Sequence, residues 1–142
     1  MKPLDDPEVR AWHVLADDDL RIARLALEQP VPILGPACFH AQQATEKEMK
    51  ALLVALGADV PRTHDCVLLV RLLAGFIPEA VELRGPAAVI SAYGVSPRYP
   101  ALGTATTQGE AADALAQAEH VRTWARARWE IGEARAQDEF RG

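Results

Sequence analysis

The sequence of 142 residues lacks any run of about 20 apolar residues, the length that a membrane-spanning helix needs. Its first residues also lack a basic region followed by an apolar stretch, which is the pattern of a secretory signal. Both absences lead us to expect a cytoplasmic protein that does not enter the membrane. Runs of β-branched residues are absent too, while alanine and leucine are abundant, and this balance favours an all-α fold.

Motifs that carry chemistry are scarce. The two cysteines, Cys38 and Cys66, lie in apolar helical patterns, and neither has a second ligand at the spacing of a metal site. The chain has no Gly-rich phosphate loop, no G-x-S-x-G nucleophile motif and no paired acidic motif of a nucleotidyltransferase. We therefore interpret the cysteines as buried free thiols, and we expect neither a metal nor a cofactor.

Basic residues are outnumbered, because 15 Lys and Arg stand against 20 Asp and Glu and the formal net charge is −5. Proteins that bind nucleic acid through a broad electrostatic field are usually basic, so the balance argues against this class. A small basic patch on the surface remains compatible with this net charge. The length of 142 residues and the 49% hydrophobic content are those of one domain with its own core.

Helical signals cover most of the chain. Asp6 is placed to cap a first helix that begins at Pro7, where proline is tolerated, and runs to Gln29. A break rich in proline and glycine follows, and a second helix then ends near Leu56. A third helix is predicted from His64 to Gly75, with apolar residues on most of its sides.

The second half is less regular. A fourth helix (78–93) is predicted to be interrupted at Gly85-Pro86, and the longest loop (96–107) follows it. Thr107 and Glu110 then have the spacing of a capping box in front of the last helix.

The order of these elements predicts an all-α, antiparallel up-and-down helical bundle with four long helices plus the shorter interrupted helix. We assign the bundle to residues 1–132. Residues 133–142 form a polar C-terminal tail that we expect to fray.

The stretch Phe39–Asp65 organises the chain. Gly57 can take the left-handed conformation that ends a helix, and Thr63 is placed to cap the next helix, with Asp65 in its first turn. Glu48 breaks the apolar pattern, because it lies near the middle of the apolar arc. Either it sits at an edge and reaches solvent, or it is a paired carboxylate at an interface or a site.

Three pieces of sequence, in this order, resemble the HEPN family of small helical bundles, whose name abbreviates higher eukaryotes and prokaryotes nucleotide-binding. They are F-H-A-Q-Q-A-T-E-K-E-M-K-A-L-L at Phe39–Leu53, P-R-T-H-D at Pro61–Asp65 and R-Y-P at Arg98–Pro100. The resemblance implies an antiparallel bundle that often dimerises and has a cleft associated with nucleotides or RNA. It also implies either a separately encoded minimal nucleotidyltransferase as partner or ribonuclease activity, often that of a toxin.

This chain departs from the family pattern at two points. The family's ribonucleases resemble one another in an arginine that is followed by a histidine after four to six residues. None of the four histidines here has an arginine at that upstream distance, so we expect no RNA cleavage by the usual family route. The resemblance also implies a small residue at position 48, where this chain has Glu48.

The candidate ligand-binding residues are Glu46, Lys47, Lys50, Arg62, His64, Arg98 and Tyr99. The histidine suits a general base or a ligand contact, and the R-Y-P loop offers an arginine for phosphate and a tyrosine for base stacking. The other basic residues supply positive charge near one end of the second helix. The structural alternative is that the histidine bonds the preceding loop, the tyrosine plugs the bundle end, the loop arginine pairs with an acid such as Glu46, and the lysines are solvated.

We therefore predict a nucleotide- or RNA-associated binding module, non-catalytic and homodimeric, that pairs with a separately encoded minimal nucleotidyltransferase in a toxin–antitoxin-like manner. The alternative is a divergent metal-independent ribonuclease that uses His64 with Arg62 or Arg98. A third hypothesis is a bundle whose only role is assembly, which an uncovered apolar stripe on the first or last helix would favour.

Overall fold

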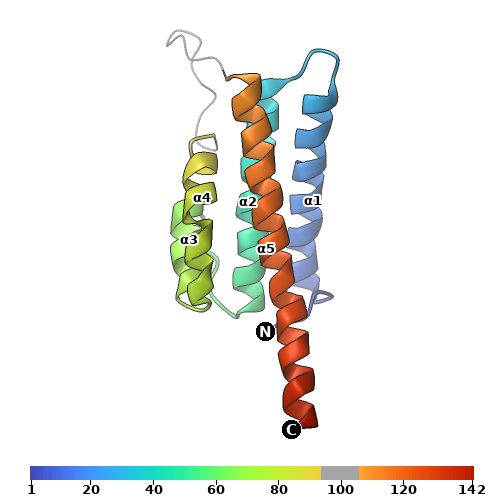
Figure 1. Ribbon diagram of the computed structural model, residues 1–142, viewed down its shortest axis with the longest axis vertical. Coiled ribbons are helices and arrows are strands. Elements are labelled where there is room, and N and C mark those ends of the chain that lie inside the picture. The colour runs from blue at the N-terminus through green and yellow to red at the C-terminus, as the bar shows by residue number, and fades with distance from the viewer. Residues whose placement is uncertain (94–105) are drawn as a thin grey trace.

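The computed structural model describes residues 1–93 and 106–142, and these residues form helices with no strand among them. Figure 1 shows α1, α2 and α5 side by side, with α3 and α4 packed on the far side of α2 from α1. The predicted all-α bundle is therefore confirmed. The elements, in chain order, are α1 (Pro7–Glu28), α2 (Leu34–Ala55), α3 (Cys66–Ala74), the 3₁₀ helix η1 (Pro78–Leu83), α4 (Arg84–Ser91) and α5 (Gln108–Arg141).

Three of these helices are long, and α3 is short. α1 and α2 have 22 residues each and α5 has 34, whereas α3 has only nine. The sequence predicted a longer third helix starting at His64. The chain instead uses residues 57–65 as a linker, so the helix begins two residues later, at Cys66.

α2 is the central helix and contacts α1, α3, α4 and α5. From Ala41 to its end, the apolar residues of α2 are buried, among them Met49, Leu52 and Leu53. Burial of side chains of this size contributes about 1.5–3 kcal/mol each. The polar residues Gln42, Thr45, Glu46, Glu48 and Lys50 are buried on the same helix, so α2 holds most of the buried polar side chains among the residues that the structure describes.

The helix ends follow local signals in the sequence. The Asp6 carboxylate accepts hydrogen bonds from the backbone N–H groups of Glu8 and Val9, at 3.0 and 3.2 Å. Thr107 and Glu110 form the predicted capping box at the start of α5, with bonds of 3.1 and 3.2 Å. Each device satisfies backbone donors that a helix N-terminus leaves unpaired.

The C-terminal end of α2 explains how the next segment is placed. Gly57 has φ 74°, the left-handed conformation that glycine adopts without strain. The Gly57 and Ala58 N–H groups bond the carbonyls of Val54 and Leu53, each at 3.0 Å, which is the Schellman pattern. The linker then turns back along α2, so that His64 lies beside the middle of α2 rather than beyond its end.

Two further boundaries differ from the sequence prediction. Asp65, not Thr63, caps α3, because its carboxylate accepts from the N–H groups of Val67 and Leu68 at 3.0 and 3.2 Å. The interruption of the fourth helix lies at the junction of η1 and α4, just before Gly85-Pro86. Proline is tolerated there because the first turn of a helix needs no N–H donor.

α5 continues as a helix to Arg141, where the sequence predicted fraying. Figure 1 shows its last turns extending beyond the bundle, and their residues are exposed. The division of the chain at residue 132 stays a prediction. None of the helices in the described ranges is long and apolar enough to span a membrane.

Candidate functional site

A buried carboxylate forms the centre of the candidate site. Glu46 is only 3% exposed and accepts three hydrogen bonds. Lys50 Nζ donates at 2.6 Å, His64 Nδ1 lies at 3.0 Å, and Gln42 Nε2 donates at 3.2 Å. Gln42, Glu46 and Lys50 are spaced by four residues, so they meet on one side of α2. The carboxylate is therefore compensated by one cation and two further donors, as a buried charge requires.

His64 is held at the surface of the linker by this carboxylate. Its side chain is 66% exposed, whereas that of Glu46 is 4% exposed. The linker backbone is fixed as well, because the His64 carbonyl accepts from Gln42 Nε2 at 3.1 Å and the Thr63 hydroxyl accepts from the Asp65 N–H at 3.0 Å. With Nδ1 bonded to Glu46, Nε2 is the ring nitrogen that remains available to a ligand.

Lys50 is not available as a surface charge. Its side chain is 8% exposed, its ammonium is bonded to Glu46, and it lies 5.6 Å from the ring centroid of Trp12. A cation at this distance from a tryptophan ring is attracted to the ring face. Lys50 therefore neutralises Glu46 and packs under α1, and Trp12 is an anchor between α1 and α2.

Lys47 lies in a different cluster from Lys50. It is bonded to Asp19 on α1, and the same carboxylate bonds His40 Nδ1 at 2.7 Å. Asp19 is buried, while His40 and Lys47 are partly exposed. The structure thus separates two lysines that the sequence had placed in one site, because each is bonded to a different carboxylate.

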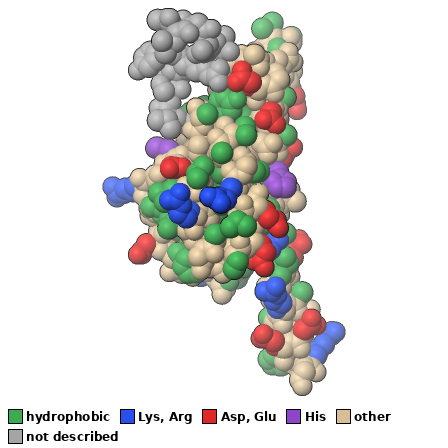
Figure 2. Space-filling view, turned by 60° about the vertical axis from the view of Figure 1, so that its left-hand side comes forward, with side chains coloured by type: hydrophobic (Ala, Val, Ile, Leu, Met, Phe, Trp, Pro, Cys, Tyr) green, Lys and Arg blue, Asp and Glu red, His purple; other side chains and the backbone are tan. Residues whose placement is uncertain are grey.

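The remaining candidate residues are Arg62, Arg98 and Tyr99. Arg62 is exposed, two residues before His64, and has no ion pair or hydrogen bond within the described ranges. Arg98 and Tyr99 lie outside the described residues, so their relation to His64 stays a prediction. On the face shown in Figure 2, Lys and Arg side chains lie scattered among acidic and hydrophobic ones rather than in one basic patch.

A second buried carboxylate lies two residues further along α2. Glu48 is 1% exposed and receives a bidentate contact from Arg126 on α5, in which Nη2 donates to Oε1 at 2.6 Å and Nε donates to Oε2 at 3.3 Å. Arg126 also bonds Asp17 on α1 at 2.7 Å. Of the two interpretations of Glu48, the paired carboxylate is therefore the one observed. Burial raises its pKa above the ordinary value, and the bond to Arg126 partly offsets that rise.

His13 borders this second cluster. Its Nε2 lies 3.6 Å from Glu48 and has no hydrogen-bond partner within the described part of the chain, and its ring packs edge-on against Trp129 at 5.1 Å. Burial, followed by the nearby positive charge of Arg126, lowers the pKa of His13 to about 4. The imidazole is therefore neutral near pH 7. It is buried and packs against Trp129, so we assign His13 to the packing of α1 on α5.

The cysteines are buried thiols, as predicted. Burial, with a smaller effect of the Glu46 charge, raises the pKa of Cys66 to about 12, which removes thiolate reactivity at neutral pH. Within residues 1–93 and 106–142, no group of three or more His, Cys, Asp or Glu side chains is placed to hold a metal ion.

The residues of these clusters that the sequence did not predict are Gln42, Asp19, His40 and Arg126. The four-residue step from Gln42 to Glu46 was a visible signal for a bond on one helix. The bonds from Asp19 to α2 and from Arg126 to Glu48 left no comparable signal, because the partners are 28 and 78 residues apart.

Comparisons with known proteins agree with this fold. The HEPN domain family matches residues 9–128. The crystal structure of TT1696 from Thermus thermophilus is 30% identical, covers 84% of this chain and 96% of its own, and superposes with a TM-score of 0.68. The structure of ST0689, an archaeal HEPN homologue, is 22% identical over 91% of this chain and 99% of its own, also with a TM-score of 0.68. A search of curated proteins found no match. Because the family match spans most of its length, the chain belongs to the HEPN domain family.

Proposed function

We propose that this HEPN domain is a non-catalytic module that binds the phosphate or base of a nucleotide or RNA through His64. The observation that carries the proposal is the contact between the buried Glu46 carboxylate and the exposed His64 ring. It holds Nδ1 of the imidazole and leaves Nε2 open to a ligand, while Arg62 lies close in sequence with its charge unpaired within the described ranges. Pre-organised donors of this kind lose little conformational freedom on binding.

Calorimetry with a panel of nucleotides and a short single-stranded RNA tests the proposal. We expect His64→Ala to lower the affinity about tenfold, the cost of one hydrogen bond to a charged group. His120 is an exposed histidine on α5, so His120→Ala is the matched control and should bind like the wild type. Equal affinities of the His64→Ala and wild-type proteins, or no binding by either, would refute the proposed site.

Two protein partners are part of the same proposal. We infer that the domain forms a homodimer and that it pairs with a separately encoded minimal nucleotidyltransferase, in a toxin–antitoxin-like arrangement. Membership of the HEPN family supports this inference. Co-expression with a nucleotidyltransferase encoded beside it, followed by co-purification, is the direct measurement. Failure of the two proteins to co-purify would leave the nucleotide site standing and remove the partner.

The alternative of a divergent ribonuclease is favoured by one specific contact. A carboxylate that orients an exposed imidazole is the arrangement of a general base, and Glu46 and His64 have it at 3.0 Å. If the domain cleaves RNA without a metal, His64→Ala should abolish cleavage and Glu46→Gln should slow it. Cleavage that survives His64→Ala would exclude this alternative.

A further inference from the structure

Asp19 of α1 is a buried carboxylate that holds a second histidine of the chain. It is 7% exposed, and both of its oxygens are occupied. Oδ1 lies 2.7 Å from His40 Nδ1, and Oδ2 accepts a hydrogen bond from Lys47 Nζ. His40 Nε2 has no partner among the described residues, and it is not one of their buried unpaired atoms, so it meets solvent. The pair of Asp19 and His40 therefore repeats the arrangement of Glu46 and His64.

Lys47 adds a cation to this pair. An ammonium has three N–H donors, and Lys47 uses one of them on Asp19. Its side chain is 21% exposed and that of His40 is 26% exposed, so both reach solvent beside the carboxylate that they share. A protonated imidazole has an N–H on each nitrogen and can bond Asp19 and a phosphate together. The α1–α2 seam formed by these three residues therefore has the chemistry of a phosphate contact.

Two side chains of α2 lie between the seam and the Glu46 side of the helix. At about 100° per residue, Phe39 and Gln43 project between Glu46 and His40, which are about 120° apart. Phe39 is 44% exposed, and its ring stands edge-on to that of His40 with the centroids 5.2 Å apart. An exposed aromatic ring offers a face on which an unpaired base can stack.

The orientation of the Gln43 amide is fixed by a chain of hydrogen bonds. Gln42 Nε2 donates to Glu46 Oε2 at 3.2 Å and to the His64 carbonyl at 3.1 Å, so Gln42 Oε1 is the atom that accepts from Gln43. Gln43 Nε2 donates to it at 2.8 Å, and Gln43 Oε1 then has no donor in the described part of the chain. A carbonyl oxygen accepts from a hydroxyl but cannot donate to a phosphate. The middle of this surface therefore suits a nucleoside, and its two sides suit phosphates.

We propose that single-stranded RNA crosses α2 from His64 to the α1–α2 seam, with one base stacked on Phe39 and the 2′-hydroxyl bonded to Gln43 Oε1. The proposal rests on the proposed function at His64 and names its ligand. Glu46 and His40 are six residues apart, which adds about 9 Å along the helix to the angle between them. One phosphate cannot contact both sides, whereas a strand carries a phosphate to each. Because a paired base has no free face, the strand is single.

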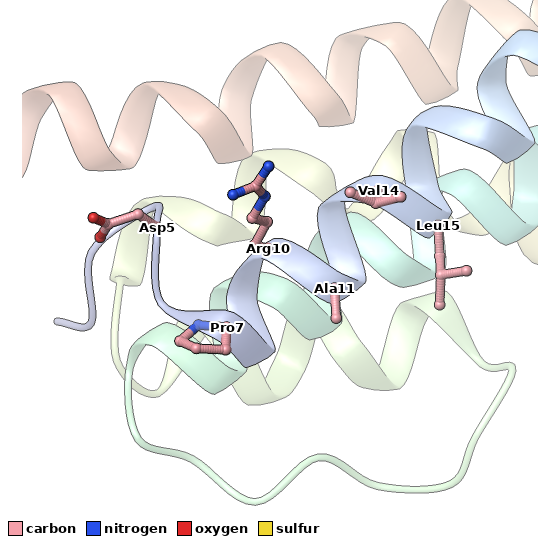
Figure 3. Close-up of a pocket in the computed structure, with 6 residues that line it drawn as sticks. All are labelled: Asp5, Pro7, Arg10, Ala11, Val14 and Leu15. Atoms are coloured by element: carbon pink, nitrogen blue, oxygen red, sulfur yellow. The ribbon is translucent and has the colours of Figure 1, made fainter.

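A shallow hollow of about 600 Å³ on the first half of α1 has no such arrangement. Figure 3 shows the residues that line it, which are Asp5, Pro7, Arg10, Ala11, Val14 and Leu15. All of them come from one short segment. The Arg10 side chain, its only cation, is bonded to no residue that the structure describes. The hollow therefore lacks a cation held in place by a buried carboxylate, which the surface of α2 has.

Calorimetry with r(AAAA) and with adenosine 5′-monophosphate tests whether the ligand reaches the seam. We expect the wild type to bind the tetranucleotide about tenfold or more tightly than the mononucleotide, because only the longer ligand contacts both sides. His40→Ala keeps the bond between Asp19 and Lys47, and it should lower the affinity for r(AAAA) about tenfold without changing that for the mononucleotide. His64→Ala should weaken both ligands, and His120→Ala is the matched control that should weaken neither.

Replacement of Phe39 tests the stacking contact. Phe39→Ala should lower the affinity for r(AAAA) about tenfold or more, whereas Phe39→Trp should retain it because the indole offers a larger face. Phe76 is 53% exposed in the turn after α3, so Phe76→Ala is the matched control. Circular dichroism confirms that each variant keeps its helices. An affinity unaffected by Phe39→Ala would overturn the path over this ring.

The DNA analogue d(AAAA) tests the choice of RNA. It lacks the 2′-hydroxyl, so the wild type should bind it about tenfold more weakly than r(AAAA). Gln43→Leu removes the acceptor and should bind the two tetranucleotides alike. Equal affinities of the wild type for RNA and DNA would overturn the assignment to RNA.

The outcomes separate this inference from the proposed function. Equal affinities for the mononucleotide and r(AAAA), or an r(AAAA) affinity unaffected by His40→Ala, would overturn the path across α2 and leave the His64 site standing. An affinity that falls with His40→Ala but not with His64→Ala would refute the proposed function, and with it this path. Binding of neither ligand by the wild type would remove both.

Discussion

Glu46 and Glu48 are two residues apart on α2, both are buried, and they have different surroundings. Glu46 turns towards the linker before α3 and holds an exposed histidine. Glu48 turns towards α5 and holds an arginine that also bonds α1. Two residues on a helix are about 200° apart, so neighbouring helices receive them on opposite sides. The comparison shows how one amino acid can support a candidate ligand contact at one position and join three helices at another.

The two clusters also differ in how their charge is compensated. Glu46 has three donors from α2 and the linker, so loss of any one leaves two. Glu48 depends on Arg126, because Arg122 is 4.0 Å away and His13 is neutral near pH 7. The Glu48 cluster should therefore respond more strongly to the removal of one partner.

The largest expected effect is that of Arg126→Leu. It leaves the Glu48 carboxylate buried without its main partner, and we expect the free energy of unfolding at pH 7 to fall by about 3–5 kcal/mol. Glu48→Leu should cost less, since Arg126 keeps its bond to Asp17. The double variant should recover most of the loss, because no buried charge remains. Urea denaturation measures all three, and a cost of Arg126→Leu below about 1 kcal/mol would contradict the proposed dependence.

The second effect is a pH dependence that originates at His13. The pKa of His13 is about 4 in the folded protein and 6.5 in the unfolded chain, so the unfolded state binds more protons between these values. Stability is therefore lost as the pH falls from about 6.5 to 4, by up to about 3 kcal/mol. His13→Phe, which retains a ring against Trp129, should remove this slope.

Glu48 makes a competing contribution to the pH dependence of stability, because its pKa is raised whereas that of His13 is lowered. Its contribution to stability falls as the pH rises from its ordinary pKa through the raised one. Because Glu48 is present in both proteins, we compare the wild type with His13→Phe by urea denaturation at pH 7 and pH 5. Parallel losses of stability in the two proteins would exclude His13 as the origin.

The third effect sharpens the contrast at Glu46. Lys50→Met removes its cation and retains the side-chain length, so Glu46 keeps the bonds from His64 and Gln42. We expect a loss of about 1–3 kcal/mol, less than that of Arg126→Leu, because the carboxylate remains partly satisfied. Thermal and urea unfolding of the two variants, measured side by side, give the ranking. A larger loss for Lys50→Met would reverse the comparison.

The smallest effect on stability should come from His64→Ala. The side chain is two-thirds exposed, and substitutions at such positions usually change the free energy of unfolding by less than about 0.5 kcal/mol. The same variant should lose nucleotide affinity. A large loss of stability would instead assign His64 to the structural role of fixing the linker.

Much of the fold was predictable because its signals are local. The caps at Asp6 and at Thr107 were visible in the sequence, and so was the left-handed turn at Gly57. The start of α3 was misplaced by two residues, because Thr63 and Asp65 both have the chemistry of a cap and only the path of the linker selects between them.

The candidate site was predictable only in part. The four-residue step from Glu46 to Lys50 was visible, and the structure brings His64 to the same carboxylate. The separation of Lys47 from Lys50 was not visible, because it depends on the position of Asp19 in α1. Bonds between distant segments carry no signal in the spacing of either segment.

By itself, the sequence determined which segments before residue 133 are helical, close to where most of them begin and end, and that the chain resembles the HEPN family. The helices follow from the period of apolar residues and from caps that act over three or four residues. Only the tertiary structure decided which carboxylate meets which base. Two residues that are two positions apart on a helix project towards opposite sides and therefore contact different elements. Which element lies on each side depends on how the whole bundle packs.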